Sequence, residues 1–329
     1  MITALRKSVF SIASVSQRTM LNLTTRRFAQ WAHLDRWLAG MSRDDRANMA
    51  TNKTYKKYAV AEADYWANPA VGDENDIHDN PYHKRRSSAL KRYVNQTVMG
   101  DFKGGVADYI ASFGPFRSAL VLSHFTHLVD CLKRRVAESW TFNDYAGRFR
   151  PQDHTNAPFR VIRQDLNFAD LGERQYDLVV VDSLLHHLIN TEDLVDKISR
   201  CLVPGGHLVI PLDYCGERRF WWESKHREQM DQVLSDIPLR YLRYPLCSAS
   251  AIHFSPISPF EAVSGPELPQ LLNSRFHTVR FKASHGILFP VLAYLKKDLL
   301  ETENSLVDKL LEADESAPGS FFSAVYRLR

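Results

Sequence analysis

The pattern of apolar and polar positions between residues 176 and 213 predicts the unit around which the chain is organised. Tyr176–Val181 is a short, almost unbroken apolar run, as expected of a parallel strand buried on both faces. Apolar residues then recur at helical spacing from Leu184 to Leu202, and Pro204-Gly205-Gly206 stops the helix. His207–Leu212 is a second apolar run. Together they predict a right-handed βαβ crossover in a mostly parallel sheet.

Shorter apolar runs on either side of this unit predict the remaining strands. They are Ser118–Ser123, Trp140–Asn143, Phe159–Arg163, Thr278–Ala283 and Phe321–Arg327. The last run alternates apolar and polar residues, which is typical of a strand with one buried face. Helices are expected at Asp130–Val136, Phe220–Leu234 and Glu267–Asn273, and over most of Ile287–Ala313. The predicted fold class is therefore α/β, a Rossmann-like sheet of seven mostly parallel strands.

The chain divides into three parts: residues 1–34, a helical N-terminal extension over 35–113, and the α/β domain over 114–329. The first part contains five basic residues and many hydroxyl residues, and no acid occurs before Asp35. This composition is typical of a mitochondrial targeting segment and predicts a location in the mitochondrial matrix. A basic tail without a targeting role is the alternative.

Composition narrows the remaining classes of protein. The net charge of +4 comes from mixed acids and bases, so no strong nucleic-acid-binding field is expected. The four cysteines, at positions 131, 201, 215 and 247, show no Cys-x-x-Cys spacing and indicate reduced thiols rather than a disulfide framework. No apolar run approaches the length of a membrane span.

Motifs along the α/β domain point to a family. Asp182, Leu185-His186-His187 and Pro204-Gly205-Gly206 follow one another from the end of the fourth strand into the fifth. This order resembles the class I S-adenosylmethionine-dependent methyltransferases. Further matches to one bacterial group of methyltransferase-like proteins are Asp213-Tyr214, Gly216, Arg219-Phe220, Trp222, Ser258-Pro-Phe-Glu-Ala-Val263 and the closing segment from Phe321. The resemblance spans Trp66 to the end. It implies S-adenosylmethionine as cofactor and an antiparallel last strand that forms a hairpin with the strand before it. A generic Rossmann-like crossover is the alternative.

The glycine-rich turn that this family carries after its first strand is degenerate here. Ser123 stands at the acidic position, and Phe125, His127 and Val129 stand at the three glycine positions. A β-branched or aromatic residue forced into a left-handed conformation costs about 1–3 kcal/mol. A micromolar ligand is bound by about 8 kcal/mol, so losing about half of that leaves a millimolar site. The departure argues against retention of S-adenosylmethionine.

Other positions of the implied site keep polar residues. The resemblance implies that Asp144 binds the ribose hydroxyls, that Asp165 contacts the adenine amine, and that Asp182 lies near the transferred methyl group. Each is equally read as a polar strand terminus. His186 and His187 are candidates for a general base or for packed core residues. His124-x-x-His127 has metal-like spacing without neighbouring carboxylate or cysteine ligands, so no metal is expected.

Two functions follow from these observations. The first is a catalytically inactive methyltransferase-like protein that acts as a structural or assembly factor in a mitochondrial ribosome or respiratory complex. Its partners would be the proteins of that complex, and it would contact RNA only as part of the complex. The second is an active but divergent methyltransferase acting on a protein, an RNA or a small molecule. A pure RNA-binding module is disfavoured because the basic residues are dispersed.

Overall fold

The structure, a computed structural model, describes most of the α/β domain and part of the N-terminal extension. The described residues are 29–67, 99–100, 102–122, 127–145, 158–220, 224–237, 258–284, 309, 312–314 and 319–329. Two positions of the degenerate turn, Ser123 and Phe125, lie outside these residues. The same holds for most of the helix expected over 287–313 and for residues 1–28 of the predicted targeting segment.

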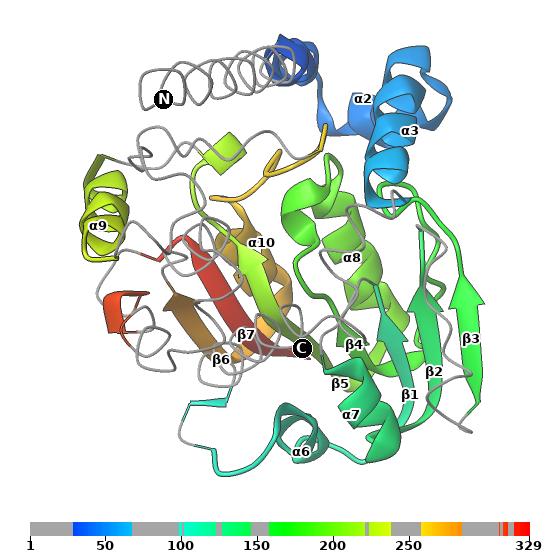
Figure 1. The fold of residues 1–329 in the computed structure, drawn as a ribbon. Coiled ribbons are helices and arrows are strands. Elements are labelled where there is room, and N and C mark those ends of the chain that lie inside the picture. Colours follow the sequence, from blue (N-terminus) through cyan, green and yellow to red (C-terminus); the bar gives the residue numbers. More distant parts are fainter. Residues whose placement is uncertain are drawn as a thin grey trace, which may run out of the picture.

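A seven-stranded sheet forms the centre of the domain, with the strand order β3-β2-β1-β4-β5-β7-β6 (Figure 1). The strands are β1 Phe116–Val121, β2 Ala137–Asn143, β3 Phe159–Ile162, β4 Tyr176–Val180, β5 Leu202–Tyr214, β6 Phe276–Ser284 and β7 Phe321–Leu328. The pairs from β3 through β5 are parallel, whereas β7 runs antiparallel between β5 and β6. This arrangement confirms the predicted fold class.

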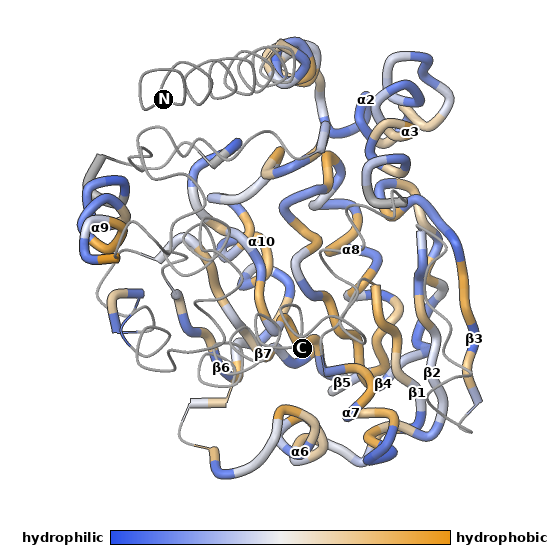
Figure 2. Tube along the Cα trace, viewed as in Figure 1, coloured by the Kyte–Doolittle hydropathy of each residue, from blue (hydrophilic) through white to orange (hydrophobic). Residues whose placement is uncertain are grey.

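Burial explains the apolar runs from which the central strands were predicted. The β4 residues Leu178, Val179 and Val180 are fully buried, because helices cover both faces of the parallel part of the sheet. Figure 2 shows the same concentration of hydrophobic residues along β1 and β4. The edge strand β6, in contrast, leaves most of its side chains exposed.

Helices line the sheet and position its loops. They are α6 Val106–Ala111, α7 Leu128–Lys133, α8 Thr191–Cys201, α9 Ser224–Ser235 and α10 Leu268–Arg275. The helix α8 buries Leu194, Val195 and Ile198 in the main hydrophobic core. Its outer face reaches α10 through Asp196, which accepts a 2.6 Å hydrogen bond from Arg275 Nε. Across the described residues, no helix is both long and apolar enough to cross a membrane.

The single helix predicted from Leu184 to Leu202 is wrong in its first half. Residues Leu185–His187 form a 3₁₀ turn, and α8 begins only at Thr191. Ser183 adopts the left-handed φ of 49° that turns the chain away from β4. The apolar spacing continued across this turn because its leucines also face the core, and spacing alone does not separate a turn from a helix.

The Pro-Gly-Gly segment does not end α8, because the helix ends at Cys201 and the segment already belongs to β5. It forms an irregularity in the pairing with β4, since Tyr176 pairs with Leu202 while Leu178 pairs with His207. Gly205 has a φ of +78° there, a conformation that explains the glycine at this position.

The described part of the N-terminal extension up to residue 67 lies across the carboxyl ends of the parallel strands, whereas α6 lies at their opposite ends (Figure 1). It contains a helix over residues 29–39, α2 Arg43–Ala47 and α3 Lys53–Ala67. Its apolar side chains form a second core with Ile189, Phe260 and Val263. Trp31 and Leu34 are buried, so the folded body includes the last residues of the predicted 1–34 segment.

Candidate functional site

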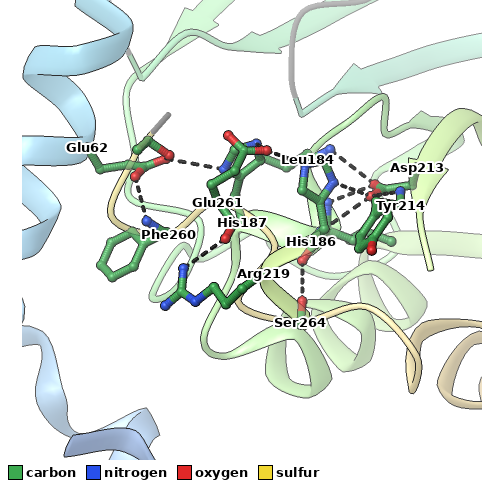
Figure 3. Close-up of polar contacts among 12 residues, drawn as sticks. Glu62, Leu184, His186, His187, Asp213, Tyr214, Arg219, Phe260, Glu261 and Ser264 are labelled. Atoms are coloured by element: carbon green, nitrogen blue, oxygen red, sulfur yellow. Dashed lines mark hydrogen bonds and ion pairs between the residues drawn. The ribbon is translucent and has the colours of Figure 1, made fainter. Parts of the chain in front are cut away.

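Three motifs that are distant in the sequence meet beyond the carboxyl ends of β4 and β5. The Leu-His-His turn lies next to the end of β5, and the Ser-Pro-Phe-Glu-Ala-Val segment packs over both (Figure 3). Helix α3 closes the group from the side of the N-terminal extension. We call the five ionisable side chains that meet here the histidine–carboxylate cluster: Glu62, His186, His187, Asp213 and Glu261.

Asp213 anchors the Leu-His-His turn from the end of β5. Its fully buried carboxylate accepts backbone hydrogen bonds from Leu184, Leu185 and His186, at 2.8–3.3 Å. The same group lies 2.7 Å from His186 Nδ1 and accepts a further bond from the Tyr214 amide. Burial alone would lower the pKa of His186, but Asp213 and Glu261 raise it to about 10. The turn is therefore held by one carboxylate.

His187 lies between two glutamates, as Figure 3 shows. Its Nδ1 atom is 3.3 Å from Glu62 Oε1, and its Nε2 atom is 3.7 Å from Glu261 Oε1. Glu62 is itself fixed by hydrogen bonds from the Ser258 hydroxyl and the Phe260 amide, at 2.9 and 2.8 Å. Burial opposes ionisation of Glu261, but the two histidines and Arg219 lower its pKa.

Arg219 ties the cluster to the N-terminal extension. Its guanidinium pairs with Asp35 at 2.7 Å and donates to the carbonyl oxygens of Pro259 and Glu261, at 2.9 and 2.8 Å. It also lies 4.9 Å from the ring centre of Trp31. Arg219 is buried, and its contacts join the segment after β5 to the N-terminal extension.

Asp165, the predicted adenine contact, is engaged by the extension. Its Oδ2 atom accepts a 2.6 Å hydrogen bond from the Tyr55 hydroxyl, and its Oδ1 atom accepts from the Asn167 backbone amide at 3.0 Å. The Asn167 side chain also donates to the Tyr55 oxygen at 3.1 Å. Both carboxylate oxygens of Asp165 therefore accept from protein donors. The Tyr55 side chain that supplies one of these donors is almost fully buried.

Asp144 directly follows β2, and Asp182 is the second residue after β4, so both lie at the strand ends where the sequence placed them. Both are buried. The backbone amide of Asp144 bonds to Ile162 at 2.9 Å, which continues the pairing of β2 with β3. Their predicted roles at the ribose and near the methyl group stay predictions.

Two residues of the degenerate turn are described. His127 precedes α7 with a φ of −100°, so it does not adopt the left-handed conformation available to glycine. Its imidazole is 4% exposed and lies 3.9 Å from Asp130. Val129 lies within α7 and is partly exposed. A histidine side chain thus fills buried space that a glycine would leave open.

Sequence reasoning missed two members of this region, Glu62 and Tyr55. Both belong to α3, which lies before the main part of the resemblance, and no motif marked them. Glu261 was quoted within a matching motif without a role. Its neighbours in the motif, Ser258 and Phe260, bond to Glu62, and this contact joins segments about 200 residues apart.

Comparison with known proteins agrees with this architecture. Residues 127–210 match the family described as "Methyltransferase domain", so the match begins at His127, inside the degenerate turn. This match and the strand order confirm the resemblance to class I methyltransferases. A search of curated proteins returns no match.

Three solved structures illustrate the similarity. One is a putative methyltransferase of Haloferax volcanii in complex with the activator Trm112, at 11% identity, coverage of 82% of this chain and 98% of that chain, and a TM-score of 0.45. Another is the N-methyltransferase NodS of Bradyrhizobium japonicum with S-adenosyl-L-homocysteine. It shows 15% identity, coverage of 77% of this chain and 90% of that chain, and a TM-score of 0.38. The third is an S-adenosylmethionine-dependent methyltransferase of Mesorhizobium loti. It shows 14% identity, coverage of 68% of this chain and 98% of that chain, and a TM-score of 0.40.

Proposed function

We propose that this chain is a mitochondrial methyltransferase-fold protein that does not transfer methyl groups. It acts as a structural or assembly factor within a larger complex, either the mitochondrial ribosome or a respiratory complex. The fold is that of a methyltransferase, and the parts specialised for the cofactor have changed while the scaffold is kept. A protein selected only to fold and bind keeps its core and loses its cofactor turn.

The observation that carries this proposal is the buried imidazole of His127. In methyltransferases the turn after the first strand approaches the methionine half of the cofactor closely, which requires glycine. Here His127 stands at one of those positions and is packed inside the protein. Displacing a buried side chain to admit a ligand costs about 2–3 kcal/mol in lost burial. Ser123 also stands where the family has an acidic residue, so that contact is lost as well. Together the two losses would weaken a micromolar site about a hundredfold or more.

On the adenine side, the Asp165 carboxylate already accepts hydrogen bonds from the protein. An adenine amine that bonds to this carboxylate would share it with the Tyr55 hydroxyl and the Asn167 amide. A hydrogen bond to a charged group contributes about 1.5–3 kcal/mol, and a carboxylate that is already shared contributes toward the lower end of that range. This contact therefore does little to offset the loss at the turn.

The test is binding of S-adenosylmethionine to the purified full-length chain, by calorimetry and by thermal shift. A ligand that binds only the folded state raises its stability by RT ln(1 + [L]/Kd). We expect no heat and no shift at about 10 micromolar ligand, a concentration at which a micromolar site would be mostly occupied. A micromolar signal that Asp144→Ala abolishes would contradict the proposal, because it would show an intact ribose contact.

The mitochondrial part of the proposal rests on the basic, acid-free start of the chain. A fluorescent fusion to residues 1–34 is expected to reach mitochondria. The same fusion with its five basic residues replaced by glutamine is expected to stay in the cytosol. Affinity purification from mitochondria is expected to recover ribosomal or respiratory subunits. Recovery of the chain as a free monomer would contradict the assembly role.

A second candidate function is an active, divergent methyltransferase. The observation that favours it is the histidine–carboxylate cluster, because it keeps ionisable groups together beyond the ends of β4 and β5. In open α/β sheets ligands bind beyond the carboxyl ends of the strands. Labelled S-adenosylmethionine incubated with mitochondrial extract and the protein separates the two functions. Transfer that is lost in His187→Gln would establish the enzyme.

A further inference from the structure

The histidine–carboxylate cluster has a regular arrangement that methyl transfer does not require. Each histidine places its Nδ1 atom against a carboxylate. The Nδ1 atom of His186 lies 2.7 Å from Asp213, and that of His187 lies 3.3 Å from Glu62. Each then directs Nε2 toward the same oxygen of Glu261, at 3.4 and 3.7 Å. The order is thus carboxylate, imidazole, shared carboxylate, imidazole, carboxylate.

The separations of the three inner donors fit one metal ion. His186, His187 and Glu261 each offer one donor atom, and these three atoms lie within 4.8 Å of one another. Zinc binds imidazole nitrogen and carboxylate oxygen at about 2.0–2.2 Å in tetrahedral sites, which sets neighbouring donors about 3.3–3.5 Å apart. The observed 3.4 and 3.7 Å require adjustments of a few tenths of an ångström.

The outer carboxylates match the way proteins prepare histidines for metals. A metal-binding histidine generally donates its second ring N–H to a carboxylate, which fixes the tautomer and leaves the other nitrogen free to coordinate. Asp213 stands in this relation to His186, and Glu62 to His187. Both outer carboxylates are themselves held by backbone amides, from Leu185 at 2.8 Å and from Phe260 at 2.8 Å.

We propose that the histidine–carboxylate cluster binds a divalent transition metal, zinc being the expected ion, through His186 Nε2, His187 Nε2 and Glu261 Oε1. Two imidazoles and a carboxylate suit zinc better than magnesium or calcium, which prefer all-oxygen ligands. Three protein donors leave a fourth tetrahedral position for water or a small ligand. Arg219 does not compete with the ion for the Glu261 carboxylate, because the hydrogen bonds of its guanidinium go to Asp35 and to backbone carbonyls.

The ion would fasten the extension to the α/β domain. It joins the turn after β4 to the segment that carries Glu261, and Glu62 extends the contact to α3. Glu62, Glu261 and His186 are each 7% exposed or less, so the ion would be buried. The proposal does not depend on S-adenosylmethionine and fits both an inactive scaffold and an enzyme.

The experiment uses the full chain without an affinity tag, stripped by a chelator and then titrated. Zinc is titrated in competition with a chromophoric chelator, and cobalt reports the geometry by its absorption spectrum. We expect one ion per chain, a tetrahedral cobalt spectrum and a higher melting temperature with zinc. Glu62→Gln, which changes an outer carboxylate, should weaken binding about 10- to 100-fold.

Glu261→Gln and His187→Gln remove inner donors and should weaken binding further. The matched control is Glu267→Gln, whose carboxylate pairs with Arg218 at the surface, and it should leave the affinity unchanged. Should the inner variants fail to fold, the wild-type titration still decides. A wild-type chain that binds neither zinc nor cobalt, or a Glu261→Gln variant with wild-type affinity, would overturn the proposal.

Discussion

Replacing Asp213 by asparagine tests whether one carboxylate holds the Leu-His-His turn. The change keeps the size of the side chain but removes its charge and turns one acceptor oxygen into a donor. Asp213 is fully buried and accepts from three consecutive backbone amides as well as from His186. An amide NH₂ group at one of those positions would face N–H donors, so at least one buried donor loses its partner.

The expected loss can be worked from these contacts. Removing one partner of a buried ion pair typically costs about 3–5 kcal/mol, because the remaining group is left uncompensated. A single unsatisfied backbone donor costs about 1–3 kcal/mol. This cost is already partly contained in the cost of breaking the ion pair, so the two are not added. We therefore expect Asp213→Asn to lower the free energy of unfolding by about 3–5 kcal/mol. Domains have about 5–15 kcal/mol in all, so the variant should be clearly destabilised.

Urea denaturation followed by circular dichroism measures this change, and amide hydrogen exchange locates it. The amides of Leu184, Leu185 and His186 should lose protection before the strands do. Asp170→Asn is the control, since that exposed carboxylate accepts one bond from Gly172 at 3.0 Å and should change stability by less than about 0.5 kcal/mol. A loss below about 1 kcal/mol with unchanged protection of the turn would refute the reasoning.

Three further changes probe the contacts of the extension and one strand. Tyr55→Phe removes the hydroxyl that bonds to Asp165 and should cost about 1.5–3 kcal/mol in denaturant unfolding; no loss would mean that water replaces the bond fully. Arg219→Lys cannot reproduce the hydrogen bonds to Asp35 and to two backbone carbonyls, and it should lower the free energy of unfolding by about 2–3 kcal/mol. An Arg219→Lys variant as stable as the wild type would contradict this expectation. Burial and nearby Arg327 lower the pKa of His207. The unfolded chain therefore takes up its proton first, and wild-type stability should fall as pH drops below about 6.5, more steeply than in His207→Gln; equal slopes would count against this.

The strands of the α/β domain could be recognised along the chain because their cause is local. A strand buried on both faces needs consecutive apolar residues, and residues 178–180 of β4 and 119–121 of β1 form such runs. The resemblance to methyltransferases implied the antiparallel last strand. The order of the strands across the sheet came only from the structure, because apolar runs do not specify it. The single helix predicted after β4 failed because Asp213, almost 30 residues away, holds the turn that interrupts it.

The cluster itself could not be read from the chain, because it depends on distance in space. Glu62, His187 and Glu261 come from three segments, and nothing in their spacing relates them. Their meeting is decided by where α3 and the segment after residue 258 pack on the ends of the sheet. Local patterns record which residues must be buried, whereas the partners of a buried charge are set only when separate elements close around it.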